Sequence, residues 1–121
     1  MKVMDIIDRV DMMEPNVYSP EQKISWLSSL DGKIFEEVIK THETPIIECW
    51  TPYETGNEEL IIGMPYGEEI YYNYLLMKIE AENSETQRYN KRASLFANAY
   101  REWTNWYNRH HMPRRTGMQF I

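Results

Sequence analysis

Aromatic residues recur at helical spacing near the end of the chain, and this stripe constrains the fold more than any other feature. Its members are separated by four, three, four, three and four positions, which places them on one face of an α-helix. The stripe consists of Tyr89, Ala93, Phe96, Tyr100, Trp103 and Tyr107. A face this apolar has to be covered, so the pattern predicts a long helix to about His110, ended by Pro113, whose stripe forms a core.

Three earlier helices are expected from the same kind of periodicity. They cover residues 1–13, residues 19–41 and residues 70–82. The second has the clearest start signal, because Ser19 can cap it and Gln22, three positions on, completes a capping box. A second box of this type, Ser84 with Gln87, is expected to start the last helix.

Residues 44–63 differ from the helical segments on either side. A strand-like apolar run begins at Ile46, a shorter run lies over 60–62, and a turn composition separates them. We therefore predict a mainly α fold: a small bundle of about four helices, with a two-stranded hairpin or extended loop inserted between the second and third. The predicted organisation is one domain over residues 1–113, followed by a basic tail over 114–121.

The charge of the chain is unevenly distributed. The net charge is −6, but residues 108–121 contain three Arg and no carboxylate, so the body carries −9 and the tail +3. An acidic body disfavours general nucleic-acid binding, whereas a basic tail can dock on an acidic partner. The one cysteine, Cys49, allows no intrachain disulfide and fits a reducing compartment, and no apolar run is long enough to cross a membrane.

No pattern of catalytic residues stands out in the sequence. His110 and His111 are adjacent and point about 100° apart on a helix, so they do not converge on one metal ion. Cys49 lies in an apolar run without an evident base, which predicts a buried, inert thiol. The motifs of nucleotide-binding, hydrolase and zinc-protease sites are not found. We expect no enzyme activity, no cofactor and no metal.

Protein contacts are the expected role of the remaining aromatic and basic residues, because Tyr and Trp are favoured at interfaces. Part of the aromatic stripe exceeds what one small core can cover, and that part is expected to dock a neighbour. The candidate interface residues are Trp50, Tyr53, Leu60, Ile62, Trp106, Arg109, Arg114, Arg115 and Phe120.

Several strings in the chain resemble a family of small phage and prophage head–tail connector proteins from Gram-positive hosts. In the first half these strings are Asp5-Ile6-Ile7-Asp8-Arg9-Val10-Asp11, Pro15-Asn16-x-Tyr18-Ser19-x-Glu21-Gln22-Lys23 and Trp26-Leu27-x-x-Leu30-Asp31-Gly32. In the second half they are Thr51-Pro52-Tyr53, Pro65-Tyr66, Tyr71 to Leu75, Glu85-Thr86-x-Arg88-Tyr89-Asn90 and Trp106-Tyr107-Asn108-Arg109-x-His111-Met112-Pro113. The likeness runs to Pro113. Lys91-Arg92 departs from the expected small polar residues, and the tail has no counterpart.

The resemblance implies a virion structural adaptor without catalysis. Such proteins form a ring beneath the portal at the capsid–tail junction, continue the DNA channel and dock a further head-completion or tail protein. DNA would pass without specific binding, and the free subunit, made in the host cytoplasm, can be monomeric until the portal templates it. Two other classes stay open: a small helical regulatory interaction module, and a nucleic-acid-binding domain that uses residues 88–101 and the tail.

Overall fold

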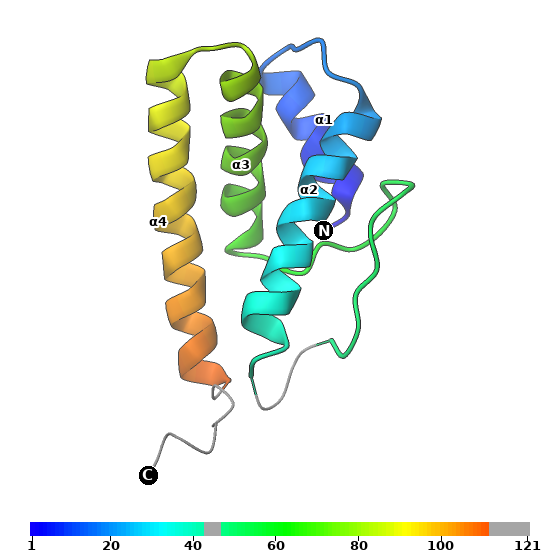
Figure 1. Ribbon diagram of the computed structural model, residues 1–121, viewed down its shortest axis with the longest axis vertical. Coiled ribbons are helices and arrows are strands. Elements are labelled where there is room, and N and C mark those ends of the chain that lie inside the picture. The colour runs from blue at the N-terminus through cyan, green and yellow to red at the C-terminus, as the bar shows by residue number, and fades with distance from the viewer. Residues whose placement is uncertain (43–46, 112–121) are drawn as a thin grey trace.

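The described part of the chain is mainly helical. A computed structural model describes residues 1–42 and 47–111. It contains α1 (Val3–Met13), α2 (Pro20–Ile34), the π-helical turn η1 (Phe35–Ile39), α3 (Gly67–Glu82) and α4 (Thr86–His110). In Figure 1, α3 lies in the middle, with α4 along one side and α1 and α2 on the other. The prediction of a mainly α fold with four helices is confirmed, and the described residues contain no strand.

Helix α2 begins where the sequence predicts. The backbone N–H of Gln22 donates to Ser19 Oγ at 3.1 Å, which satisfies one of the free donors of the first turn. Gly32 lies inside α2 and does not break the helix. It leaves room for Trp50, because a Cβ at Gly32 would lie 3.1 Å from the indole ring. The irregularity comes later, in the π-helical turn that carries the chain on from α2.

Helix α4 begins differently from the prediction. Its N-cap is Glu85, without a side-chain cap, so the expected Ser84–Gln87 capping box is not formed. Ser84 has a φ of 59°, in the left-handed region, and lies in the tight turn between α3 and α4. The N–H of Glu85 donates to the carbonyl of Glu80 at 3.0 Å, which closes that turn with backbone groups alone.

The aromatic stripe of α4 divides into two parts. Trp103 and Tyr107 are buried, together with the neighbouring Ala99, whereas Tyr89 is 37% exposed. The middle of the stripe, Ala93, Phe96 and Tyr100, is only partly buried. Along its length α4 packs chiefly on α3. One neighbouring helix cannot cover a stripe this long.

The loop between η1 and α3 does not form the predicted hairpin. Its described residues, 47–63, form an irregular loop whose one bridge is an isolated antiparallel pair between Glu59 and Lys2. Their carbonyl groups instead meet the first turn of α1: Val3 N–H donates to Glu58 at 3.0 Å, and Met4 N–H to Gly56 at 2.9 Å. These N–H groups have no partner within the helix, so the loop satisfies donors that would otherwise be unpaired.

Gly67, the first residue of α3, allows the loop to approach closely. A Cβ at this position would lie 2.1 Å from the carbonyl oxygen of Ile62, a backbone atom that cannot turn away. We expect Gly67→Ala to lower the free energy of unfolding by about 1–3 kcal/mol, as overpacking does. Urea denaturation would measure the change. Gly63→Ala is the control, because a Cβ there meets nothing within 4 Å, and equal losses in the two variants would contradict the explanation.

Candidate protein–protein interface

A buried carboxylate, Asp31 of α2, fixes the loop to the bundle. Its Oδ2 accepts hydrogen bonds from the Tyr53 hydroxyl at 2.5 Å and from the Ile61 N–H at 3.0 Å. Its Oδ1 accepts from the Tyr71 hydroxyl of α3 at 2.6 Å, and this hydroxyl in turn accepts from the Ile62 N–H at 3.0 Å. One side chain thus joins α2, α3 and both ends of the 53–62 segment.

The electrostatics of this network follow from its burial. Asp31 is fully buried, and desolvation raises the pKa of its carboxyl, while the hydrogen bonds from Tyr53, Tyr71 and Ile61 act in the opposite direction. Burial and the nearby carboxylate also raise the pKa of both tyrosines. All three groups lie in a dense hydrogen-bonded cluster, so we interpret Asp31 as a structural anchor of the surface above it.

The turn at the tip of the loop is closed by a second carboxylate. Glu58 accepts from the backbone N–H groups of Glu54 at 2.6 Å, Thr55 at 3.1 Å and Gly56 at 2.8 Å. These hydrogen bonds lower the pKa of Glu58 to about 2, and the bond from Glu54 has the largest effect. Gly56 has a φ of 90°, which a residue with a side chain rarely adopts.

The lowered pKa of Glu58 predicts how this turn responds to acid. A carboxyl whose pKa falls on folding stabilises the fold above its unfolded-state pKa, near 4.5, and this contribution is lost as the pH falls towards 2. We expect Glu58→Gln to remove the part of the acid-induced loss of stability that arises here. Urea midpoints between pH 7 and pH 3 would measure it, with the exposed Glu48→Gln as control. A Glu58→Gln profile that parallels the wild type would contradict the prediction.

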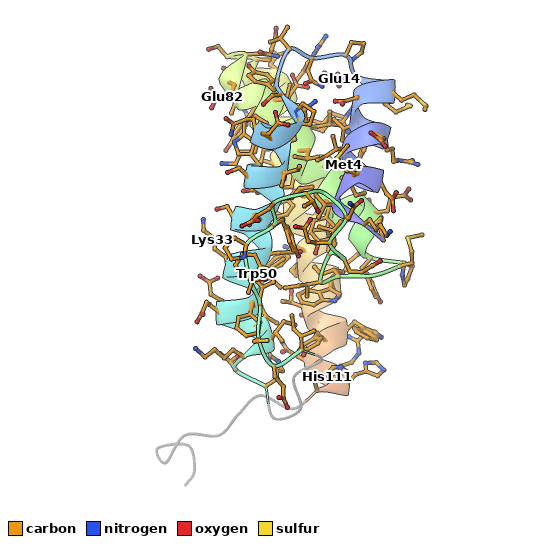
Figure 2. The ribbon with its side chains drawn as sticks, turned by 90° about the vertical axis from the view of Figure 1, so that its right-hand side faces the viewer. Met4, Glu14, Lys33, Trp50, Glu82 and His111 are labelled. Atoms are coloured by element: carbon orange, nitrogen blue, oxygen red, sulfur yellow. The ribbon has the colours of Figure 1, made fainter. Side chains whose placement is uncertain are left out.

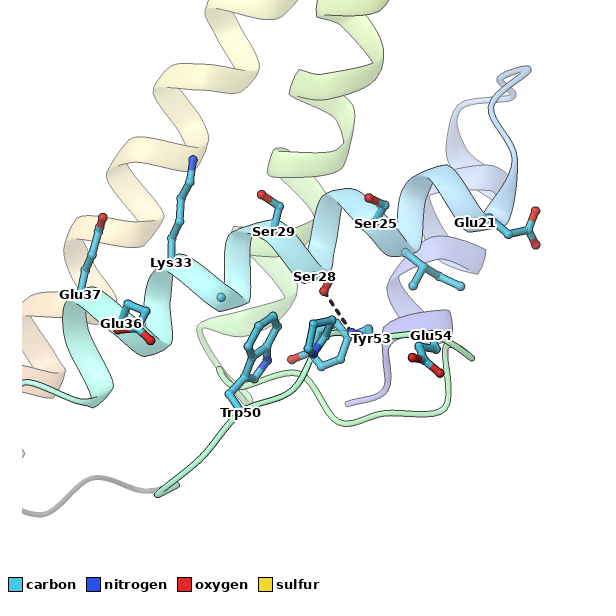
Figure 3. Close-up of a pocket in the computed structure, with 13 residues that line it drawn as sticks. Glu21, Ser25, Ser28, Ser29, Lys33, Glu36, Glu37, Trp50, Tyr53 and Glu54 are labelled. Carbon is cyan, nitrogen blue, oxygen red and sulfur yellow. Dashed lines mark hydrogen bonds between the residues drawn. The ribbon is translucent and has the colours of Figure 1, made fainter.

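A groove of about 590 Å³ lies between α2 and the anchored loop (Figure 3). Its apolar part includes Trp50, Pro52 and Tyr53, and the N–H of Tyr53 donates to Ser28 Oγ at 3.0 Å, as the dashed line in Figure 3 shows. Figure 2 shows Trp50 on the loop beside α2, in the same part of the molecule as Lys33. The groove is therefore formed between a helix and a loop that hydrogen bonds hold in place.

The C-terminal end of α4 forms a second, smaller hollow against the start of α3. Its volume is about 260 Å³, and it is lined by aromatic rings and by residues 61–65. Trp106 contacts Tyr66 at a ring-centroid distance of 5.8 Å, and His111 stacks on Tyr107 at 4.1 Å. His42 is buried beside this end, where its Nε2 lies 2.8 Å from Asn108 Oδ1.

The predicted interface residues fall into three groups. Tyr53, Leu60 and Ile62 are buried in the core of this chain, because the loop turns its apolar side chains inward. Trp50 and Trp106 are partly buried and line the two hollows, and Arg109 is exposed. The remaining three lie outside the described residues: Arg114, Arg115 and Phe120.

Other polar groups link the helices away from these hollows. The buried ammonium of Lys23 in α2 pairs with Asp11 of α1 at 2.5 Å. Near the α1–α2 connection, burial, with a further contribution from the Glu14 carboxyl, raises the pKa of Glu80. Both groups are explained by helix packing. The sequence indicates that both side chains are buried. Lys23 lies four positions before Leu27 and Asp31 four positions after it, so both fall on the apolar face of α2.

Side chains that could act in catalysis or bind a metal do not form a cluster in the described part of the chain. Cys49 is exposed, contrary to the expectation of a buried thiol, because Ile47 and Trp50 are the residues of this run that pack against the core. Within residues 1–42 and 47–111, no group of three or more His, Cys, Asp and Glu is placed to hold a metal ion. No helix in these same ranges has the length and apolarity needed to cross a membrane.

The two hollows and the anchored loop therefore stand as the candidate interface. Comparisons of the chain with protein-family models, with curated proteins and with solved structures find no match in any of the three.

Proposed function

We propose that this chain is a structural adaptor of a phage virion, a subunit of a ring that links the portal to the tail. The observation that carries the proposal is the anchoring of residues 53–62 by Asp31. A loop held in this way presents a preformed surface, so binding costs less conformational entropy than ordering a free loop would. The sequence strings that resemble head–tail connectors supply the class of partner.

The partners in this proposal are the portal protein, further copies of the chain, and a head-completion or tail protein. An adaptor between two assemblies needs separate contact surfaces, and the α2–loop groove and the hollow at Trp106 supply two. A net charge of −6 suits a subunit past which DNA moves without binding. Retention of the chain on duplex DNA at low salt would contradict this part of the proposal.

Electron microscopy of the protein mixed with portal rings from the same genome tests the proposal. We expect an added ring of density on one end of the portal. Trp106→Ala combined with Arg109→Glu should weaken the complex if the end of α4 contacts the portal, whereas the exposed pair Asp8→Ala and Glu82→Ala should leave it intact. A folded protein that gives no added density at high concentration would overturn the adaptor role. It would favour the alternative of a small regulatory interaction module.

A further inference from the structure

The α2–loop groove has an acidic rim around an apolar floor. The carboxylates on the rim belong to Glu21, Glu36, Glu37 and Glu54, against one cation, Lys33. All four glutamates are exposed. Glu36 lies 3.4 Å from Lys40, whereas the other three form no ion pair within the described ranges. The groove therefore favours a cationic occupant.

The floor of the groove suits an extended peptide with arginines. Trp50 presents an indole edge and face beside α2, and a guanidinium can stack on such a ring while it pairs with carboxylates. Ser25 and Ser29 line the same side of α2, and their hydroxyls can bond to the backbone of a bound segment. These features together match arginine and backbone groups better than a purely apolar helix.

The chain itself contains a segment of this chemistry. Residues 112–121, which follow α4 and His111, carry Arg114 and Arg115, no carboxylate, and two apolar residues, Phe120 and Ile121. Ten residues follow His111, and an extended chain of that length spans up to roughly 33 Å.

We propose that the α2–loop groove binds the basic C-terminal segment of a neighbouring copy of this chain. This contact is head-to-tail, because the segment and the groove are different surfaces, and repetition of such a contact closes into a ring when the rotation allows. The inference rests on the proposed self-association of the adaptor. Exposed ion pairs are individually weak and screened by salt, so the contact should be salt-sensitive and strengthened by ring closure.

A fluorescent peptide of residues 112–121, titrated with the full-length protein at low salt, tests the contact directly. The acceptor should carry Arg114→Ser and Arg115→Ser, so that its own segment competes less. We expect saturable binding that Glu37→Lys with Glu54→Lys weakens at least tenfold. The matched control is Asp8→Lys with Glu82→Lys, which changes the net charge equally on exposed positions outside the groove. Equal weakening in both variants, or no binding, would overturn the proposal.

A mixing experiment distinguishes a neighbouring copy from the same chain. One variant carries Glu37→Lys and Glu54→Lys, and the other carries the neutral substitutions Arg114→Ser and Arg115→Ser, which do not pair with the reversed groove. By sedimentation velocity, each alone should stay monomeric at concentrations where the wild type associates, and the mixture should form dimers only. Unchanged association of either variant alone, or a wild type that stays monomeric while binding the peptide, would overturn the intermolecular contact. Portal rings that still gain density with the Arg114→Ser, Arg115→Ser variant would leave the adaptor role standing without this contact.

Discussion

Replacing Asp31 with Ala is expected to lower the free energy of unfolding by about 3–5 kcal/mol. The substitution leaves three buried donors, the hydroxyls of Tyr53 and Tyr71 and the N–H of Ile61, without their shared acceptor. Each unsatisfied buried donor costs roughly 1–3 kcal/mol, and partial relaxation of the loop reduces the sum. Urea denaturation followed by circular dichroism would measure the loss.

Two tyrosine variants test whether the loss comes from the hydrogen bonds. Tyr53→Phe removes one donor to Asp31, whereas Tyr71→Phe also leaves the Ile62 N–H without its acceptor. We therefore expect Tyr71→Phe to cost more than Tyr53→Phe, by about 1 kcal/mol. Asp8→Ala, an exposed carboxylate of α1, should change stability by less than about 0.5 kcal/mol. An Asp31→Ala variant as stable as Asp8→Ala would contradict the anchoring role.

The pH dependence of Asp31 has the opposite sign to that of Glu58. Burial raises the pKa of Asp31 on folding. Its titration therefore stabilises the fold most below the unfolded-state pKa, near 3.8, and this stabilisation is lost as the pH rises through the folded-state pKa. The contribution of Glu58 is lost as the pH falls. Glu58→Gln and Asp31→Asn should therefore tilt the stability profile below pH 7 in opposite directions.

Trp103→Ala is the second substitution with a large expected effect, about 3–5 kcal/mol of unfolding free energy. The Trp103 ring is 3% exposed and contacts Tyr100 and Tyr107 at centroid distances of 5.9 and 5.2 Å. Its removal loses apolar burial and leaves a cavity that the long, rigid α4 cannot close fully. Thermal and urea unfolding of the purified variant would give the change.

The control for Trp103→Ala lies on the same stripe. Tyr89→Ala truncates an aromatic side chain that is 37% exposed, and we expect a change below about 0.5 kcal/mol. Equal losses at the two positions would mean that the whole stripe is core, as the sequence pattern alone suggests. A loss of partner binding in Tyr89→Ala without a loss of stability would assign the first half of the stripe to an interface.

Periodicity predicted the helices well because it reports which residues share a face. The Ser19 cap was predictable for the same local reason, since a cap depends on neighbours within one turn. How far a face is covered depends on what packs against it, so the spacing did not show which part of the stripe is core. In the structure Tyr89 is exposed and Phe96 is only partly buried. Which residues of a helix face are covered depends on tertiary packing, and the spacing along the sequence does not show it.

The loop was the least predictable part of the candidate interface. Its apolar, β-prone residues suggested two strands, but its backbone groups bond to α1 and to side chains of α2. The burial of Asp31 could be predicted from the sequence, because a carboxylate four positions after Leu27 falls on the apolar face of α2. Its hydrogen-bond partners could not be predicted, because Tyr53 and Tyr71 come from distant parts of the chain.

The Asp31 network has a consequence for the kinetics of local opening. The amide protons of Ile61 and Ile62 are held by groups that also join α2 to α3. Loop amides usually exchange with solvent through small local fluctuations, but the acceptors of these two amides are buried groups that also bond to each other between α2 and α3. We expect their hydrogen-exchange protection to approach that of core amides in α3 and to fall selectively in Tyr71→Phe. The segment would then unfold with the bundle as one cooperative unit, and a protease would cut it only after the helices separate.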